Sequence, residues 1–583
     1  MPCLKNRPTI PQELQQLRET DRTDLEALCA HYRQFIIDEV LQHGGHFSAN
    51  LGTIELTVAL HYVLNTPEDQ LVWDVGHQAY LHKVLTGRKA DFGTIRKKDG
   101  LSGFPRQSES EFDVFGTGHS STSISAVLGL AEADKLRSIQ RQHVAVIGDG
   151  SLTGGMAWEA LNNAAHSHTN ILIVINDNQM GIDPNAGALN QYLNELKDVP
   201  NFFTDMGFTY YHTSDGHDID ILVSQLKNLT TVSGPKIWHV KTVKGKGYKQ
   251  AENEQTKWHS VKYVKIDDVE TPSPGDKFQD VFGHTLLELA RSNKNIVGIT
   301  PAMPSGCSMK ILMDALPEQC FDVGIAEQHA ITFSAGLATN GMIPFCNIYS
   351  TFFQRGLDQF IHDVCLQNLP VIFCLDRAGV VGEDGATHHG VFDISLAQGI
   401  PNCIIMAPAN NAELRQMMYT AVDCNQPVII RYPKGSGGNQ PWNVPFEALN
   451  IGESVVTKTG KDCCIIALGT LLDEAMQAAE ILLENDVSVQ VINARFVKPL
   501  DTKSIDNILD NFDCVVTVED GAKTGGFGSA IVSYAHEKDY NGKVHVLGYP
   551  DEFIDHASRE ELLDMYGLDA DGIASKITSL NLP

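Results

Sequence analysis

The chain has 583 residues, of which 43% are hydrophobic and 20% charged, so it can build several hydrophobic cores and is not disordered as a whole. The formal net charge of −28 argues against a protein that coats nucleic acid or an anionic membrane. No apolar run reaches the roughly 18 residues of a membrane span. We expect no signal peptide, because the first 21 residues lack an apolar segment. Twelve scattered cysteines without a CxxC pair indicate a reducing, cytoplasmic compartment.

Short apolar runs alternate with longer helical patterns from residue 143 to the C-terminus. The runs are too short and too rich in β-branched residues for buried helices, so we predict buried strands. They are 143–148, 171–176, 237–242, 295–300, 371–376, 403–407, 427–432, 463–468, 487–493, 514–519 and 543–548. Helical patterns such as 470–485 lie between them. This alternation predicts an α/β protein with doubly wound, mostly parallel sheets and helices on both faces.

Two breaks divide this pattern. Residues 267–277 are polar and contain two prolines, and residues 433–446 are rich in glycine and proline. The sequence therefore predicts three α/β domains, 1–266, 278–432 and 447–583.

Polar residues follow two successive predicted strands in the first domain. Gly148-Asp149-Gly150 ends one strand, and Asn178 ends the next, 29 residues after Asp149. In a strand–helix–strand crossover both lie at the carboxyl ends of parallel strands, where open α/β sheets bind ligands. A carboxylate, an amide oxygen and the carbonyl of Met180 suit Mg²⁺, which completes its shell with phosphate oxygens. Either turn alone would be an ordinary one, but the pair at this spacing favours a site for Mg²⁺ and phosphate.

Longer motifs identify a family resemblance. Residues 45–61 (GHFSANLGTIELTVALH), 73–83 (WDVGHQAYLHK), 116–126 (GTGHSSTSISA), 324–330 (GIAEQHA) and 376–393 (DRAGVVGEDGATHHGVFD) resemble the 1-deoxy-D-xylulose-5-phosphate synthases. These are transketolase-like enzymes that use thiamine diphosphate and Mg²⁺. The resemblance implies a homodimer that condenses pyruvate with D-glyceraldehyde 3-phosphate and releases CO₂. It also implies the first step of the non-mevalonate isoprenoid route, which feeds thiamine and pyridoxal synthesis.

The resemblance assigns cofactor residues in the first two domains. Glu327 matches the glutamate that hydrogen-bonds the pyrimidine ring of the cofactor and turns its amino group into a base. The remaining positions implied to contact the cofactor are His77, Gly118, His119, Ser120, Asp149, Gly150, Ser151, Asn178, Tyr248, Tyr349, Phe352 and Arg355.

The same resemblance implies catalytic and substrate-binding residues. His46 and His77 match histidines beside the reacting ring, where an imidazole can move protons near neutral pH. Asp384 and His388 match a pair on the acceptor side, with the adjacent His389 as an alternative to His388. The remaining positions implied to bind substrate, the two arginines through its phosphate, are Arg377, Arg431, Tyr349 and His259.

Some features depart from the family or leave alternatives open. The segment 181–234 is shorter than in the family, which puts a lid role there in doubt. The third domain contains no motif that we interpret as catalytic, so we expect it to serve dimer contact. One alternative function is a transketolase with a ketose-phosphate donor. Another is an inactive scaffold paralogue, although such a relative should have lost Glu327, Asp149 or Asn178.

Overall fold

The computed structural model describes residues 9–196, 200–262 and 276–580. The predicted break at 267–277 lies almost wholly outside the described residues. The chain forms two compact units, one of Met1–Asp268 with Gly324–Ala326 and one of Val269–Val323 with Glu327–Pro583.

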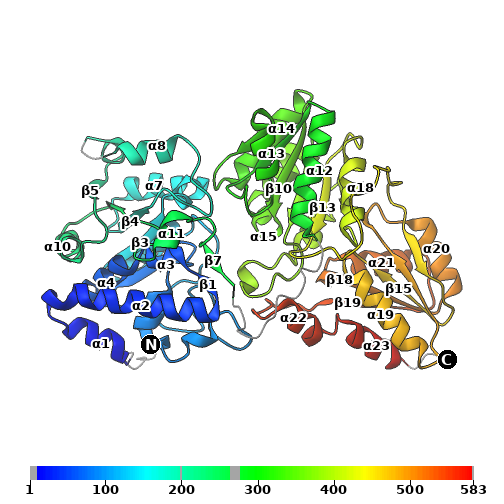
Figure 1. The fold of residues 1–583 in the computed structure, drawn as a ribbon, viewed down its shortest axis with the longest axis horizontal. Helices are drawn as coiled ribbons and strands as arrows, with labels where there is room; N and C mark the ends of the chain where they lie inside the picture. The colour runs from blue at the N-terminus through cyan, green and yellow to red at the C-terminus, as the bar shows by residue number, and fades with distance from the viewer. Residues whose placement is uncertain (1–8, 197–199, 263–275, 581–583) are drawn as a thin grey trace. The chain divides into compact units, whose positions relative to one another are not determined.

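The first unit is built on a five-stranded, fully parallel sheet with the order β2-β3-β4-β6-β5 (Figure 1). Its strands are β2 (Gln70–Trp73), β3 (His143–Gly148), β4 (Leu172–Asp177), β5 (Thr209–Thr213) and β6 (Lys236–Lys241). Successive side chains of β3 pack to opposite faces: Val144 and Val146 enter one core, and Ala145 and Ile147 enter another. Alternate burial on two faces is what a strand covered by helices on both sides requires.

Helices supply the other half of each core. The first core is closed by α2 (Leu25–His43), α4 (Ile54–Val63) and α10 (Ile219–Leu229), and the second by α6 (Ser123–Arg137) and α7 (Gly155–Ser167). The shorter elements of the unit are α1 (Gln12–Glu19), β1 (Gly45–His46), α3 (Ser48–Leu51), α5 (Tyr80–Lys83), α8 (Ala188–Glu195), α9 (Phe202–Asp205), α11 (Lys249–Asn253) and β7 (Ser260–Val261).

The second unit contains two sheets. The first has the order β17-β12-β13-β11-β10-β8-β9, and the second has the order β14-β16-β15-β18-β19. All neighbours are parallel except the pairs β12–β17 and β14–β16. The strands are β8 (Ile296–Thr300), β9 (Cys320–Asp322), β10 (Ile343–Tyr349), β11 (Ile372–Asp376), β12 (Ile404–Met406), β13 (Val428–Tyr432), β14 (Val455–Lys458), β15 (Cys463–Ala467), β16 (Val489–Asn493), β17 (Phe496–Lys498), β18 (Cys514–Ala522) and β19 (Lys543–Tyr549).

The helices of the second unit lie between these strands in the chain. The longer ones are α12 (Phe278–Ser292), α14 (Glu327–Thr339), α18 (Asn411–Ala421), α19 (Leu471–Leu483), α20 (Thr502–Asn511), α21 (Phe527–Glu537), α22 (Arg559–Tyr566) and α23 (Ala570–Thr578). The short ones include α13 (Lys310–Ala315), α15 (Ser350–Phe353), α16 (Leu357–Gln359) and α17 (Asp393–Ala397). Among the described residues, no helix is both long enough and apolar enough to cross a membrane.

The predicted fold class is confirmed, because all eleven predicted strands form and the sheets are mostly parallel. The division into three domains stays a prediction. One core joins the two sheets of the second unit: Ile405 and Ile429 of the first sheet share it with Ile466 and Val515 of the second. In addition, β17 lies in the third predicted domain but pairs with β12 in the second.

Candidate active site

The turns after β3 and β4 carry the residues of the predicted cation site. Asp149 is buried, and its Oδ2 accepts a hydrogen bond of 2.8 Å from Asn185 Nδ2. Burial, together with the nearby charge of Asp177, raises the pKa of Asp149 to about 7. A buried carboxylate next to a second acid is costly without a compensating positive charge.

The donor set around Asp149 fits a hard cation. Asn178 Oδ1 accepts a hydrogen bond of 3.0 Å from the Met180 amide, so the predicted amide and carbonyl ligands lie on one turn. Carboxylate, amide and carbonyl oxygens are the donors that Mg²⁺ prefers. In the described part of the chain no cluster of three or more His, Cys, Asp and Glu side chains could hold a metal.

Lys244 is a buried cation beside this turn that our sequence analysis missed. Its ammonium group donates to the Gly181 carbonyl, and burial lowers its pKa to about 8, against the opposing charges of Asp183 and Asp149. A signal was present in the sequence, since lysine and glycine alternate over 244–247, three residues after β6 ends. A buried lysine next to a cation site is suited to binding a phosphate.

The loop of Lys244 is fixed by a polar network from α2 and α4. His217 Nε2 accepts a hydrogen bond of 2.9 Å from the Val243 amide, and His217 Nδ1 lies 2.9 Å from Glu55 Oε2. Arg33 donates to Glu55 and, at 2.7 Å, to the Lys246 carbonyl. Both sides of Lys244 are therefore tied to the helices.

The loop Gly118-His119-Ser120 is anchored at the same edge of the sheet. Asp74, which follows β2, accepts hydrogen bonds from the Ser121 amide at 2.8 Å and the Ser123 amide at 3.0 Å. Ser121 Oγ donates to the Ser151 carbonyl at 2.7 Å, which joins this loop to the turn after β3. The segments that follow β2, β3, β4 and β6 carry the residues that we predict to contact the diphosphate, and the contacts of Asp74 and Ser151 join the first two of these segments.

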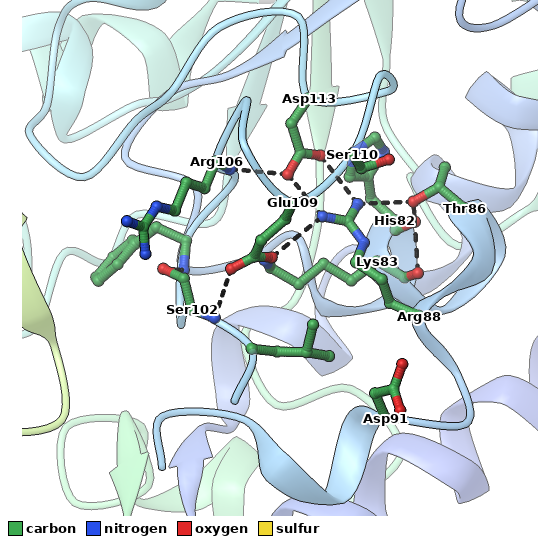
Figure 2. A network of polar contacts seen from close by, with 12 residues as sticks. His82, Lys83, Thr86, Arg88, Asp91, Ser102, Arg106, Glu109, Ser110 and Asp113 are labelled. Carbon is green, nitrogen blue, oxygen red and sulfur yellow. Dashed lines mark hydrogen bonds and ion pairs between the residues drawn. The ribbon is translucent and has the colours of Figure 1, made fainter. Parts of the chain in front are cut away.

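The part of the chain that precedes the Gly118-His119-Ser120 loop contains a buried network of charges. Figure 2 shows the Arg88 guanidinium between the carboxylates of Glu109 and Asp113, at 3.4 and 2.6 Å. His82 Nε2 lies 2.8 Å from Asp113 Oδ1, and Lys83 pairs with Glu109. The two basic groups Lys83 and Arg88 are almost fully buried, so their charges need these carboxylates.

The network also fixes the chain that leads to the loop. The Ser102 amide donates to Glu109 Oε1 at 2.6 Å, and the Arg106 amide donates to Asp113 Oδ2 at 2.7 Å (Figure 2). Between these anchors lies Phe104, whose ring centroid is 5.5 Å from that of His46. The charged network therefore fixes the backbone on both sides of Phe104, which packs on His46.

Three of the predicted histidines meet in the first unit. The ring centroids of His46 and His77 are 5.5 Å apart, and His259 lies 5.7 Å from His46 and 5.5 Å from His77. The backbone supports this, because the Phe47 amide donates to the His259 carbonyl at 3.0 Å beside the β1–β7 pair. Tyr248 packs on Phe47 with centroids 5.2 Å apart.

Glu327 begins α14 in the second unit and is buried. Arg355 Nη1 lies 3.8 Å from its Oε2, but burial prevails and raises the pKa of Glu327. Among the described residues, no group donates a hydrogen bond to Oε2. A buried carboxyl group that has a raised pKa and an oxygen without a hydrogen bond can share a proton with a ring nitrogen of a bound cofactor.

Aromatic and basic side chains around β10 and β11 form a second cluster. The Tyr349 and Phe352 rings stack with centroids 5.5 Å apart, and the His388 ring lies 5.5 Å from Phe352. The Arg377 guanidinium lies 4.2 Å from the centroid of the Tyr349 ring and is ion-paired with Asp376. These predicted cofactor and acceptor residues therefore form one group.

The structure distinguishes the adjacent histidines His388 and His389 in the loop between Arg377 and Gly390, which we call the acceptor loop. His389 is buried: its Nδ1 accepts from the Val381 amide at 3.0 Å, and its Nε2 lies 3.2 Å from the Asp555 carbonyl. Burial lowers its pKa to about 4, so it stays neutral. His388 is less buried, as is Asp384. His389 therefore holds backbone, which leaves His388 as the candidate for substrate contact.

Arg431 is more enclosed than a substrate-binding arginine usually is. Its Nε donates to Asp393 Oδ2 at 2.8 Å and its Nη2 donates to the Asp520 carbonyl at 2.9 Å, and the side chain is buried. The exposed Lys434, which sequence analysis missed, lies 3.6 Å from Glu383 in the acceptor loop. A second cation is thus available next to Asp384.

Comparisons with known proteins agree with these motifs. The family model described as 1-deoxy-D-xylulose-5-phosphate synthase matches residues 9–202 and 196–242, and the match divides inside the shortened segment 181–234. The models of the transketolase pyrimidine binding domain and C-terminal domain match 277–439 and 452–573.

Curated relatives cover nearly the whole chain. Proteins named 1-deoxy-D-xylulose-5-phosphate synthase from Cytophaga hutchinsonii and Parabacteroides distasonis are 48% and 44% identical, over 97% of this chain and 97% of their own length. A solved transketolase from Campylobacter jejuni is 17% identical with a TM-score of 0.45 over 96% of this chain and 100% of its own, too distant for an argument about the site. On the sequence relatives, the chain belongs to the 1-deoxy-D-xylulose-5-phosphate synthase family.

Proposed function

We propose that the chain catalyses the decarboxylative condensation of pyruvate with D-glyceraldehyde 3-phosphate to 1-deoxy-D-xylulose 5-phosphate and CO₂. Among the structural features, the proposal depends most on Glu327. Its buried carboxyl group has a raised pKa, and its Oε2 accepts no hydrogen bond from the described residues. A carboxyl group in this state is suited to hydrogen-bonding a cofactor pyrimidine. A purely structural salt bridge with Arg355 would not require a raised pKa. Family membership favours the synthase over a transketolase with a ketose donor.

The described residues suit thiamine diphosphate with Mg²⁺. When bound, the cofactor supplies a carbanion and an electron sink for the chemistry of the 2-oxo acid. Asp149, Asn178 and the Met180 carbonyl would hold Mg²⁺, and Glu327 would hydrogen-bond the pyrimidine. The other residues that we assign to the cofactor are His77, Gly118, His119, Ser120, Gly150, Ser151, Lys244, Tyr248, Tyr349, Phe352 and Arg355.

We assign proton transfer to His46 and His77, which lie within one cluster in the first unit. His259 would bind substrate beside them. On the acceptor side, His388 and Asp384 would bind the aldehyde and hydroxyl oxygens, and Tyr349 would contribute to the same pocket. Arg377 and Arg431 would bind the phosphate, since guanidinium groups pair with phosphate bidentately.

Further parts of the proposal concern the cell. We propose a cytoplasmic homodimer that serves the first step of the non-mevalonate isoprenoid route and thereby thiamine and pyridoxal synthesis. The net charge of −28 supports a protein without nucleic-acid or membrane partners.

An assay of CO₂ release tests the function. Purified protein with thiamine diphosphate and Mg²⁺ should release CO₂ from labelled pyruvate, and D-glyceraldehyde 3-phosphate should increase the rate and yield 1-deoxy-D-xylulose 5-phosphate. The Glu327→Gln variant is the negative control. Absence of CO₂ release, or a better rate with a ketose phosphate as donor, would refute the proposal.

A further inference from the structure

Asn50 connects the two histidines that we assign to proton transfer. The side chain of Asn50 is buried. Its Nδ2 donates to the carbonyls of His46 and His77, both at 2.8 Å, and its Oδ1 accepts from the Tyr80 amide at 2.8 Å. One amide side chain thus holds three backbone groups from two segments of the chain. By holding the carbonyls of His46 and His77, Asn50 fixes the distance between the backbones that carry the two imidazoles.

Tyr80 holds His46 from the other side. Its hydroxyl accepts a hydrogen bond of 3.1 Å from the His46 amide and lies 3.3 Å from His46 Nδ1. The ring of Tyr80 is fully buried. The hydroxyl also approaches Gly45 closely: at the positive φ of +135° a Cβ on Gly45 would lie 2.8 Å from it. Glycine is therefore needed where the hydroxyl meets the chain.

These contacts have a consequence for the protonation of His46. The amide of His46 donates to the Tyr80 oxygen, and the Tyr80 hydroxyl can in turn donate its proton to Nδ1. A neutral imidazole that accepts at Nδ1 has its proton on Nε2. His77 and His259 also face His46, with ring centroids at 5.5 and 5.7 Å.

We propose that Asn50 and Tyr80 are positioning residues, which together set the spacing of His46 and His77 and hold His46 as the Nε2–H tautomer. In that form His46 can donate a proton to an oxygen of the donor substrate. The inference rests on the proposed function, because it gives His46 and His77 their role. It adds two residues that touch neither substrate nor cofactor.

Tyr80→Phe is the sharpest test, because it removes only the hydroxyl. We expect kcat to fall about tenfold, as for the loss of one positioning hydrogen bond, with the KM for pyruvate and the affinity for thiamine diphosphate changed less than about threefold. In a His46→Asn background the same change should have no further effect on kcat. Asn50→Ala should lower kcat about 100-fold, since it releases both histidines. Thr57→Val, which removes a fully buried hydroxyl from α4 in the same core, is the matched control and should keep wild-type kcat.

Nitrogen NMR of the protein labelled at histidine gives a readout that does not need catalysis. The His46 signals, assigned by their loss in His46→Asn, should show a protonated Nε2 in the wild type and a mixture of tautomers in Tyr80→Phe. A proton on Nδ1 in the wild type, or an additive loss of kcat in the double variant, would overturn the inference. Wild-type kcat in His46→Asn would instead overturn the proposed catalytic role, while the NMR result would still decide the tautomer.

Discussion

Asp113 is the residue whose replacement should most weaken the first unit. Its Oδ1 accepts from His82 at 2.8 Å and from Arg88 at 2.9 Å, and its Oδ2 accepts from Arg88 at 2.6 Å and from the Arg106 amide at 2.7 Å (Figure 2). Asp113→Asn keeps the shape but removes the charge, and the new NH₂ group faces donors. Among the described residues, Arg88 then keeps only Glu109 as a charged partner, at 3.4 Å.

The size of the effect follows from burial. Breaking a buried pair by neutralising one partner costs about 3–5 kcal/mol, and because Glu109 remains we expect about 3 kcal/mol. Asp220→Asn is the matched control. It makes the same chemical change in the pair with Arg22, whose side chains are 65% and 44% exposed, so we expect less than about 1 kcal/mol.

Urea denaturation followed by tryptophan fluorescence measures the difference. Trp73 reports on this core, since it is buried and its ring centroid lies 6.1 Å from that of His82. The partners of Asp113 hold its pKa well below the ordinary value. Its contribution is therefore present above the unfolded pKa of about 3.9 and is lost as the pH falls below it, so the wild type but not Asp113→Asn should lose this contribution in acid. Equal urea midpoints for Asp113→Asn and the control, with equal slopes, would refute the reasoning.

Four further predictions concern the site. Asp149→Ala should bind thiamine diphosphate with Mg²⁺ at least about 100-fold more weakly, because the bridging cation loses its carboxylate; unchanged affinity in calorimetry would contradict the cation site. Glu327→Gln should bind the cofactor normally but slow proton exchange at the C2 carbon of its thiazolium ring by about 10²–10⁴-fold, and wild-type exchange measured by NMR would refute the role of Glu327. Arg377→Ala should raise the KM for D-glyceraldehyde 3-phosphate roughly 10- to 100-fold and spare that for pyruvate, whereas a rise for pyruvate would reverse the orientation of the substrates. Arg431→Ala should in addition lower the urea midpoint, because it leaves the buried Asp393 unpaired.

The sequence predicted eleven strands of mostly apolar residues and missed several others, among them β10. β10 lies between β8 and β11 in the sheet, but Pro344 and Asn347 interrupt its apolar pattern. Asn347 is fully buried, and its Nδ2 donates a hydrogen bond of 2.8 Å to the Tyr432 hydroxyl. Such a tertiary contact is not visible in a local pattern, which is why β10 could not be predicted.

The candidate site divides in the same way. Asp149 was predicted from its spacing to Asn178, and Glu327 was predicted from the family resemblance, because both signals are local information. Asn50, Tyr80 and Lys244 were missed, although all three are buried and Asn50 and Tyr80 lie within the motifs 45–61 and 73–83. Their importance comes from partners elsewhere in the chain: Asn50 acts through the carbonyls of His46 and His77, 4 and 27 residues away.

The third predicted domain also contains a residue, Asp520, whose partners lie far away in the sequence. We expected it to serve dimer contact, yet its Asp520 accepts hydrogen bonds from the Val380 amide at 3.1 Å and from Arg559 at 2.6 Å. A Cβ on Gly379, which has φ +73°, would lie 2.1 Å from the Asp520 carboxylate. The chain between Arg377 and Asp384 is therefore shaped against that carboxylate. The loop that we propose to bind the acceptor is thus supported by a single acid within β18, which no catalytic motif marks.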